Sequence, residues 1–322
     1  MSTLAHTNRI NAAGRHDLTS DTTGGSPNSS SPNTHLGNVR AYYSAVAQDY
    51  SAWSPLLNMH FGYWAAGINP LQRETMLERM NLEVLKKLNL PCRSAARLAD
   101  LGCGAGATAR TIVRHRRHTI VDAVTLVSAQ IVQGAALNEA AALHNEVRFH
   151  LADYAYTDLA SAAYDGVYAL ESACHASGPG KRALVHEAAR LLKPGGTLVI
   201  ADALRRNAKP LPSLVNRIYQ LWCKDWAVEE LAEKTALHDA LKAEGLTDIR
   251  FEDISWRVAT SALHIPFLAT RFAVRELWRA RFRLDPWRKG HIVASYAAFA
   301  LGAWLPGFGY YMVTARKPLV SR

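Results

Sequence analysis

The stretch RLADLGCGAGATAR, Arg97 to Arg110, places three glycines within five positions directly after an apolar run that predicts a strand. A strand, a tight glycine turn and a helix bring a nucleotide against backbone amides in open α/β sheets. The spacing of Gly102, Gly104 and Gly106 fits neither the dinucleotide fingerprint nor the phosphate loop. Asp100, at the end of the strand, would repel a pyrophosphate but suits an ammonium group. The stretch therefore indicates a ligand that carries an ammonium group at this turn.

The chain around this turn predicts a parallel sheet. Short apolar runs alternate with helical segments from Arg97 onward, which is typical of a sheet covered by helices on both faces. The expected strands are 97–102, 120–127, 147–153, 164–172, 196–203, 248–255 and 308–317. Pro194, Gly195 and Gly196 are expected to end a helix and turn the chain into the fifth strand.

Composition predicts three regions. Residues 1–37 are rich in Ser, Thr, Asn, Gly and Pro and predict a disordered leader. Residues 38–92 predict an N-terminal helical cap, with helices over Asn38–Trp53 and Leu71–Leu90. Residues 93–322 predict one enzyme-sized domain with helical inserts at about 208–245 and 256–305. An insert before the last strand is expected to lie over the sheet as a lid.

Charge and cysteine content limit the partners and the location. No apolar run is long enough to span a bilayer or resembles a secretion signal, so the expected location is cytoplasmic. The four cysteines are scattered, and no metal site is expected. The formal charge is +10, with arginines concentrated in Thr270–Gly290. No nucleic-acid-binding motif accompanies them, so no nucleic-acid partner is expected.

The glycine turn resembles a known family. LADLGCGAG looks like the first motif of class I S-adenosylmethionine-dependent methyltransferases, and the resemblance extends over most of Tyr42 to Lys317. It implies a Rossmann-like, mostly parallel sheet with an antiparallel last strand, and S-adenosylmethionine as cofactor. It assigns the amino-acid part of the cofactor to the first motif and its adenine to HLADYAY. The implied cofactor residues there are Asp100, Gly102, Gly104, Gly106, Asp153 and Tyr154.

The second strand departs from many relatives. Those relatives end it with an acid that holds the ribose, whereas here the sequence is VDAVTLVSAQIVQG and Asp122 falls inside the strand. Thr125 and Gln130 match the branch that contains cyclopropane-fatty-acid synthases and tocopherol methyltransferases. The resemblance therefore adds Thr125 and Gln130 to the cofactor residues.

Two further stretches resemble that branch and point to the acceptor. LNMHFGYW, Leu57–Trp64, looks like the element that covers the cofactor, and LESACHA, Leu170–Ala176, looks like the fourth-strand motif. Glu171 and His175 are the expected catalytic residues, because strand-end acids and histidines can take a proton. His60 is equally compatible with a structural role in the core. The expected acceptor-binding residues are Tyr42, Tyr43, Tyr50, His60, Tyr63, Trp64, Trp222, Trp226, Arg271 and Arg275.

The reaction is expected to be methyl transfer to carbon of a small, largely apolar acceptor of specialised metabolism, with an isoprenoid (a prenyl diphosphate) as the expected acceptor. Aromatic faces can stabilise a cation, and arginines can hold the phosphates of a prenyl diphosphate. O- or N-methylation of a polyketide, quinol or lipid is the alternative. A basic insert lying on an anionic membrane surface is another possibility, and a non-catalytic binding protein with the same fold is a third. The sequence does not set the oligomeric state.

Overall fold

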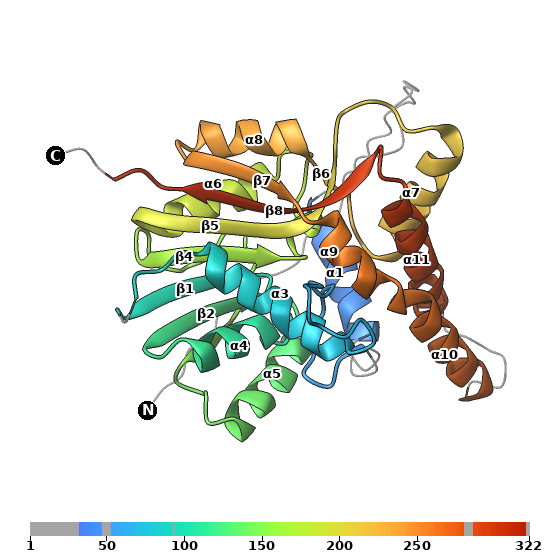
Figure 1. Cartoon of the computed structure of the whole chain (residues 1–322), viewed down its shortest axis with the longest axis horizontal. Helices are drawn as coiled ribbons and strands as arrows, with labels where there is room; N and C mark the ends of the chain where they lie inside the picture. The colour runs from blue at the N-terminus through green and yellow to red at the C-terminus, as the bar shows by residue number, and fades with distance from the viewer. Residues whose placement is uncertain (1–31, 47–52, 93, 280–285, 320–322) are drawn as a thin grey trace, which may run out of the picture.

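The computed structural model describes residues 32–46, 53–92, 94–279 and 286–319 (Figure 1). Its centre is a sheet of eight strands: β1 (Ala96–Leu101), β2 (Thr119–Thr125), β3 (Val147–Leu151), β4 (Tyr164–Leu170), β5 (Leu192–Arg205), β6 (Ala232–Glu233), β7 (Thr247–Asp253) and β8 (Phe308–Arg316). The order is β3-β2-β1-β4-β5-β8-β7, and the two-residue β6 pairs with β5. Strands β1 to β5 pair in parallel, whereas β8 runs antiparallel to β5 and β7. The expected mostly parallel sheet with an antiparallel last strand is confirmed.

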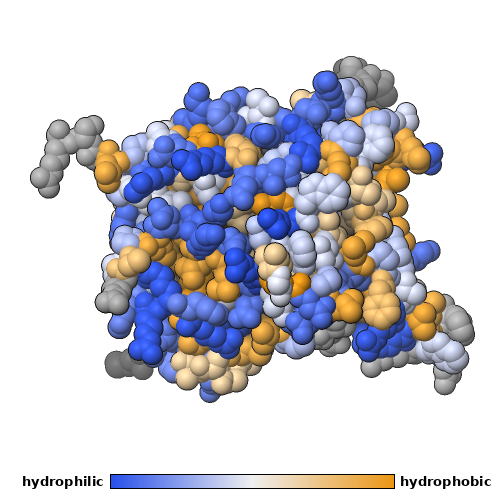
Figure 2. Space-filling view, in the orientation of Figure 1, coloured by the Kyte–Doolittle hydropathy of each residue, from blue (hydrophilic) through white to orange (hydrophobic). Residues whose placement is uncertain are grey.

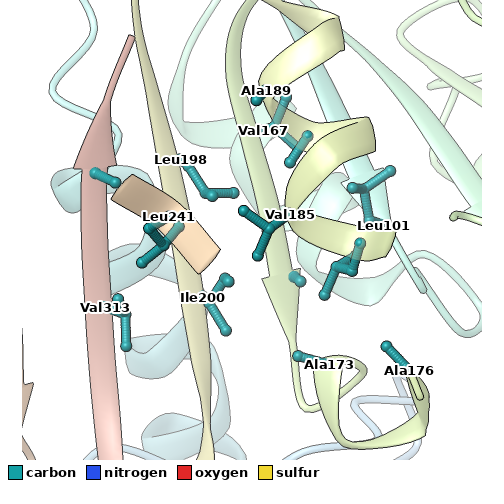
Figure 3. Packing of buried hydrophobic residues seen from close by; sticks show 14 of the residues in the cluster. Leu101, Val167, Ala173, Ala176, Val185, Ala189, Leu198, Ile200, Leu241 and Val313 are labelled. Carbon is teal, nitrogen blue, oxygen red and sulfur yellow. The ribbon is translucent and has the colours of Figure 1, made fainter. Parts of the chain in front are cut away.

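Helices cover both faces of this sheet. On one face, α4 (Ala107–His115) and α5 (Ser128–Ala140) pack on β2 and β3, α3 (Arg73–Lys87) packs on α4 and β5, and α9 (Ser255–Ala262) packs on β8. On the other face, α6 (Arg182–Leu191) and α8 (Lys234–Ala243) bury leucines and valines against β4, β5 and β8 (Figure 3). Both α3 and α8 therefore belong to the layers around the sheet, although α3 was expected in the cap and α8 in an insert.

The remaining helices gather at the carboxyl ends of the parallel strands. They are α1 (Pro32–Val46), α7 (Ser213–Asp225), α10 (His264–Arg279) and α11 (Pro286–Ala303), and they lie on the right of Figure 1. In open α/β sheets, ligands bind at this edge. Helix α11 packs against α7, α10 and α1, so segments from both ends of the chain close over the same edge.

Two boundaries differ from the expected ones. Helix α1 begins at Pro32, inside the stretch 1–37 that was expected to be a disordered leader, because proline is favoured at the first helical position. The rest of that leader, residues 1–31, lies outside the described residues. Helix α6 ends at Leu191, before the expected Pro194–Gly196 turn. The residues between Leu192 and Thr197 form an irregularity in the pairing of β5 with β4, and Gly195 has a φ of +81°.

Asp122 lies inside β2, as expected, and holds neighbouring strands together. Its carboxylate accepts hydrogen bonds from Arg97 Nε (2.8 Å), His150 Nε2 (2.8 Å) and Tyr164 Oη (3.0 Å). Burial opposes its charge, but these donors lower the pKa of Asp122 to about 2. Asp122 is therefore a structural residue of the sheet.

We expect Asp122→Asn to lower the free energy of unfolding at pH 7 by about 1–3 kcal/mol, because charged hydrogen bonds are lost. Since the folded pKa lies below the ordinary one, the contribution is present above pH 4 and disappears as the pH falls through about 2. Urea unfolding at several pH values measures this difference. The exposed control Asp239→Asn should leave stability unchanged, and equal losses in both variants would contradict the role of Asp122.

Candidate active site at the junction of two cavities

Two adjoining cavities lie at the carboxyl ends of the parallel strands. The smaller cavity, of about 230 Å³, lies over the turn after β1. The larger, of about 600 Å³, lies among α1, α7, α10 and α11. The residues that line both cavities are Tyr43, Met59, His60, Glu171 and His175. A ligand in one cavity therefore meets a ligand in the other at this junction.

The floor of the smaller cavity is the glycine turn. Gly102 has a φ of +93°, and a Cβ there would fall on the Ser172 side chain, 2.7 Å from its Oγ. Gly104 (φ +53°) also lines the cavity and faces the Met59 side chain. Gly106 does not line it: its φ of +77° starts α4, and its amide donates to Cys103 O (2.9 Å). Gly106 therefore shapes the turn, and the cofactor contact expected there stays a prediction.

We expect Gly102→Ala to lower the free energy of unfolding by about 1–3 kcal/mol, because a methyl group here is both strained in φ and blocked by Ser172. It should also reduce ligand binding in the smaller cavity. Thermal unfolding and calorimetry measure the two effects. Gly67→Ala is the matched control. Gly67 has a φ of +88°, but no atom lies within 4 Å of an added methyl group, so this variant has the backbone strain without the steric block. Unchanged binding by the Gly102→Ala variant would contradict the close contact.

Asp100 is the buried acid of this cavity. Its side chain is 2% exposed, and Oδ2 has no hydrogen-bond partner among the residues that the structure describes. Burial raises the pKa of Asp100 to about 7, and the Tyr168 hydroxyl, which lies near but outside hydrogen-bonding geometry, lowers the pKa only in part. An unpartnered carboxylate beside a cavity is a site for a cationic group.

The other expected cofactor residues also line this cavity. Thr125 Oγ1 donates to Gln130 Oε1 (2.6 Å), which leaves the Gln130 amide nitrogen near Met59 Sδ (3.7 Å). Asp153 accepts from Ala155 N (2.9 Å), and the Tyr154 hydroxyl donates to Ser172 O (2.8 Å). These hydrogen bonds fix the Tyr154 ring and the Asp153 carboxylate on one wall of the smaller cavity.

Glu171 joins three segments at the junction. Its backbone has a φ of +48° directly after β4, and its Oε1 accepts from Phe61 N (2.6 Å) and Tyr310 Oη (2.7 Å). Burial raises the pKa of Glu171 to about 8, and the nearby Asp202 adds to this shift. Glu171 is therefore largely protonated at neutral pH, with both donors on a single oxygen.

His175 is a neutral imidazole with a defined tautomer. Its Nδ1 lies 3.1 Å from Ala227 O, which can only accept, so Nδ1 carries the hydrogen. Nε2 then accepts from the Tyr43 hydroxyl at 2.8 Å. Burial lowers the pKa of His175 to about 4. The junction thus holds a lone pair at Nε2, positioned by the backbone of Ala227.

The larger cavity contains most of the expected acceptor residues. Its wall is largely aromatic and aliphatic, and it includes Tyr42, Tyr43, His60, Trp222, Trp226, Arg271 and Arg275. Burial lowers the pKa of His60 to about 4, and its Nδ1 faces Phe61 O (2.9 Å). Tyr50 lies outside the described residues.

Tyr63 and Trp64 line neither cavity, and their expected contact with the acceptor stays a prediction. Gly62 is pressed against Met76 of α3, and Tyr63 N donates to Met76 O (2.8 Å). The Trp64 indole donates to Ile68 O (2.9 Å), and its backbone nitrogen to Arg257 O. The chain therefore leaves the cavity after Phe61 and follows α3 and α9.

Sequence reasoning missed several residues of the larger cavity: Asp202, Phe272, His291 and Tyr310. Asp202 lies on β5 at the same edge as Glu171 and accepts from Cys174 N (2.9 Å) and Ala203 N (2.8 Å). Burial raises the pKa of Asp202 to about 6. Its position near the end of a predicted strand was a usable signal. The others come from segments whose neighbours depend on tertiary packing.

Comparisons with known proteins agree with this architecture. A family model described as a methyltransferase domain matches residues 98–196. An O-methyltransferase from Pyrenophora dematioidea is 32% identical over 197 residues, 61% of this chain and 70% of that protein. The 27-O-demethylrifamycin SV methyltransferase of Amycolatopsis mediterranei (strain S699) is 28% identical over 288 residues, 85% of this chain and 97% of that protein. The structure of the cyclopropane synthase MmaA2 from Mycobacterium tuberculosis aligns with a TM-score of 0.75 at 15% identity, covering 88% and 98% of the two chains.

The chain belongs to the S-adenosylmethionine-dependent methyltransferases. Its methyl donor is S-adenosylmethionine, which supplies a methyl group on a cationic sulfonium and has an ammonium group in its amino-acid part. The unpartnered Asp100 carboxylate in the smaller cavity fits that group. Within 32–46, 53–92, 94–279 and 286–319, no helix is long and apolar enough to cross a bilayer, and no three His, Cys, Asp or Glu side chains are placed to hold a metal ion.

Proposed function

We propose that this enzyme methylates a hydroxyl group of a small, largely apolar acceptor of specialised metabolism. The observation that carries the proposal is the neutral His175 at the junction of the two cavities, with Nε2 as an acceptor and Nδ1 fixed on Ala227 O. The relatives named as O-methyltransferases support the choice of oxygen over carbon. This revises the expectation of carbon methylation.

The chain's own residues can perform four tasks in this reaction. Asp100 and the glycine turn bind the donor, and the apolar walls of the larger cavity hold the acceptor and exclude water. The acceptor hydroxyl takes the place of the Tyr43 hydroxyl on His175 Nε2. As the acceptor oxygen forms its bond to the methyl carbon, the bond between that carbon and the donor sulfur would break and leave S-adenosylhomocysteine, while the hydroxyl proton passes to His175 Nε2.

Glu171 is assigned a positioning role. Its raised pKa keeps it largely protonated at neutral pH, and its two donors tie the segment at Phe61 to β8 through Tyr310. This contact fixes the floor of the larger cavity at the junction. The proton of the acceptor is therefore assigned to His175 rather than to Glu171.

The test uses the full chain with labelled S-adenosylmethionine and a panel of phenolic polyketides, quinols and aliphatic alcohols. Mass spectrometry identifies the products, and carbon NMR of a ¹³C-methyl product distinguishes a methyl group on oxygen from one on carbon. We expect oxygen methylation of at least one acceptor. Products methylated only on carbon would refute the proposal.

Carbon methylation of a prenyl diphosphate is a second candidate, and the arginines favour it. Arg271 and Arg275 line the larger cavity together with aromatic side chains, and guanidinium groups bind phosphates well. Prenyl diphosphates therefore belong in the acceptor panel. If one of them is the substrate, Arg271→Ala with Arg275→Ala should raise its KM and leave that of an uncharged prenyl alcohol unchanged.

A further inference from the structure

Helix α10 has apolar side chains on two opposite sides. Ile265, Leu268, Ala269 and Phe272 lie on the side that lines the larger cavity. Phe267 (67% exposed) and Trp278 (76% exposed) lie in solvent. Successive residues of a helix are turned by about 100°, so Phe267 and Trp278 lie on the same side of α10, away from Phe272. Val274 (50% exposed) lies beside them and also lines the larger cavity. A surface helix needs only one apolar stripe to pack on its own protein. Phe267 and Trp278 line neither cavity and therefore have no evident packing role in the described part of the chain.

Arginines flank this outer side of α10. Arg271 and Arg275 are exposed on α10, and Arg271 makes no hydrogen bond or ion pair with any residue in the described ranges. Arg275 Nε lies 3.6 Å from Glu276 Oε1. Hydrophobic and strongly hydrophilic residues lie next to each other in the lower right of Figure 2, where Figure 1 places α10. Exposed aromatic residues next to cations on one helix are typical of helices that lie in a membrane interface.

We propose that the outer face of α10, formed by Phe267, Arg271, Val274, Arg275 and Trp278, docks on the surface of an anionic lipid bilayer. The aromatic and aliphatic side chains enter the interface between headgroups and acyl chains, and the two guanidinium groups bind lipid phosphates. The formal charge of +10 attracts the whole chain to the same surface.

The position and charge of this face favour a lipid bilayer. Helix α10 lies at a corner of the molecule (Figure 1), where a helix can meet a flat, deformable bilayer surface. A second copy packed against the same face would bring Arg271 and Arg275 of both chains together, and like charges repel. Lipid phosphates supply the opposite charge.

Docking in this orientation brings the larger cavity to the membrane. Arg271, Val274 and Arg275 belong to the outer face and also line that cavity. An apolar acceptor dissolved in the bilayer would therefore reach the cavity beside α10 without crossing water. The docking itself does not rest on the proposed oxygen methylation, because vesicle binding is measured without methyl transfer.

The experiment is co-sedimentation of the full chain with vesicles of phosphatidylcholine, with and without phosphatidylglycerol, over a range of salt concentrations. We expect binding only to the anionic vesicles and weaker binding at high salt. The double variants F267S/W278S and R271E/R275E should each reduce vesicle affinity by at least about tenfold. Thermal unfolding and S-adenosylmethionine binding establish that each variant is folded.

Two matched controls separate docking from general effects. R117E/R148E makes the same change in net charge at exposed arginines away from α10, and V132S/L214S removes apolar groups from exposed positions on α5 and α7. Both controls should retain vesicle binding. Absence of binding by the unaltered chain, or equal losses in test and control variants, would overturn the proposal. The proposal would also be overturned if the unaltered chain were a dimer that did not bind vesicles and F267S/W278S were a monomer. The outer face of α10 would then join two copies of the chain.

Discussion

Asp100→Asn is expected to weaken S-adenosylmethionine binding about 100-fold or more and, at the same time, to raise the unfolding temperature of the ligand-free protein. The loss of affinity follows because the ammonium group of the donor would lose its buried carboxylate partner, which typically costs about 3 kcal/mol or more. The gain in stability follows because burial raises the pKa of Asp100 to about 7. A carboxyl whose folded pKa is raised destabilises the fold once the pH exceeds its ordinary value.

The pH dependence sharpens this expectation. The stabilising effect of the Asp100→Asn substitution should be absent near pH 3, where the acid is protonated in both states, and complete above about pH 7. Donor affinity of the unaltered enzyme should fall as the pH drops below about 7, because Asp100 gains a proton. Calorimetry and thermal unfolding measure both effects. Asp122→Asn is the matched control, since it should lose stability and keep affinity; unchanged donor affinity in the Asp100→Asn variant would refute the assignment.

His175→Gln is expected to lower kcat by about 100-fold or more, the typical contribution of a positioned general base. Donor affinity should stay the same, because His175 lies at the junction of the two cavities rather than at the glycine turn. Since burial lowers the pKa of His175 to about 4, the unaltered enzyme should hold a constant kcat from about pH 6 upward. A kcat that instead rises through about pH 8 would point to Glu171, whose pKa is raised to about 8.

Single-turnover kinetics with saturating donor separates this chemical effect from binding. His186→Gln, on the exposed side of α6, is the matched control and should leave kcat unchanged. Full activity in the His175→Gln enzyme would contradict the assignment of the base. The natural acceptor, or the best one from the panel, serves as substrate in both measurements.

The sheet was predictable because its pattern is local. Most strands from Arg97 onward contain a short apolar run, and the glycine and proline turns beside them are visible within a few residues. The two-residue β6 has no such pattern and was not predicted. The smaller cavity was predictable for the same reason: the carboxyl ends of β1, β2, β3 and β4 meet at one edge, so residues at those ends converge. Gly106 is the one expected cofactor residue that does not line this cavity, because its left-handed φ starts α4.

The larger cavity was less predictable because tertiary packing builds it. In Leu57–Trp64, the contact of Gly62 with Met76 decides that Phe61 faces the cavity while Tyr63 and Trp64 leave it. Tyr310 reaches Glu171 across 139 positions of sequence. No local pattern encodes either contact. The choice of oxygen over carbon likewise rests on the placement of Nε2 of His175 and on the relatives, which residue types alone did not decide.

The central claim is that donor and acceptor occupy the two cavities and meet at His175 and Glu171. A crystal structure of the enzyme with S-adenosylhomocysteine tests it most directly. We expect the ammonium group beside the Asp100 carboxylate and the sulfur directed toward the residues shared by both cavities. The larger cavity should remain open for an acceptor. A ligand bound in the larger cavity, or one with its adenine at Asp100 and its sulfur away from His175, would contradict the account.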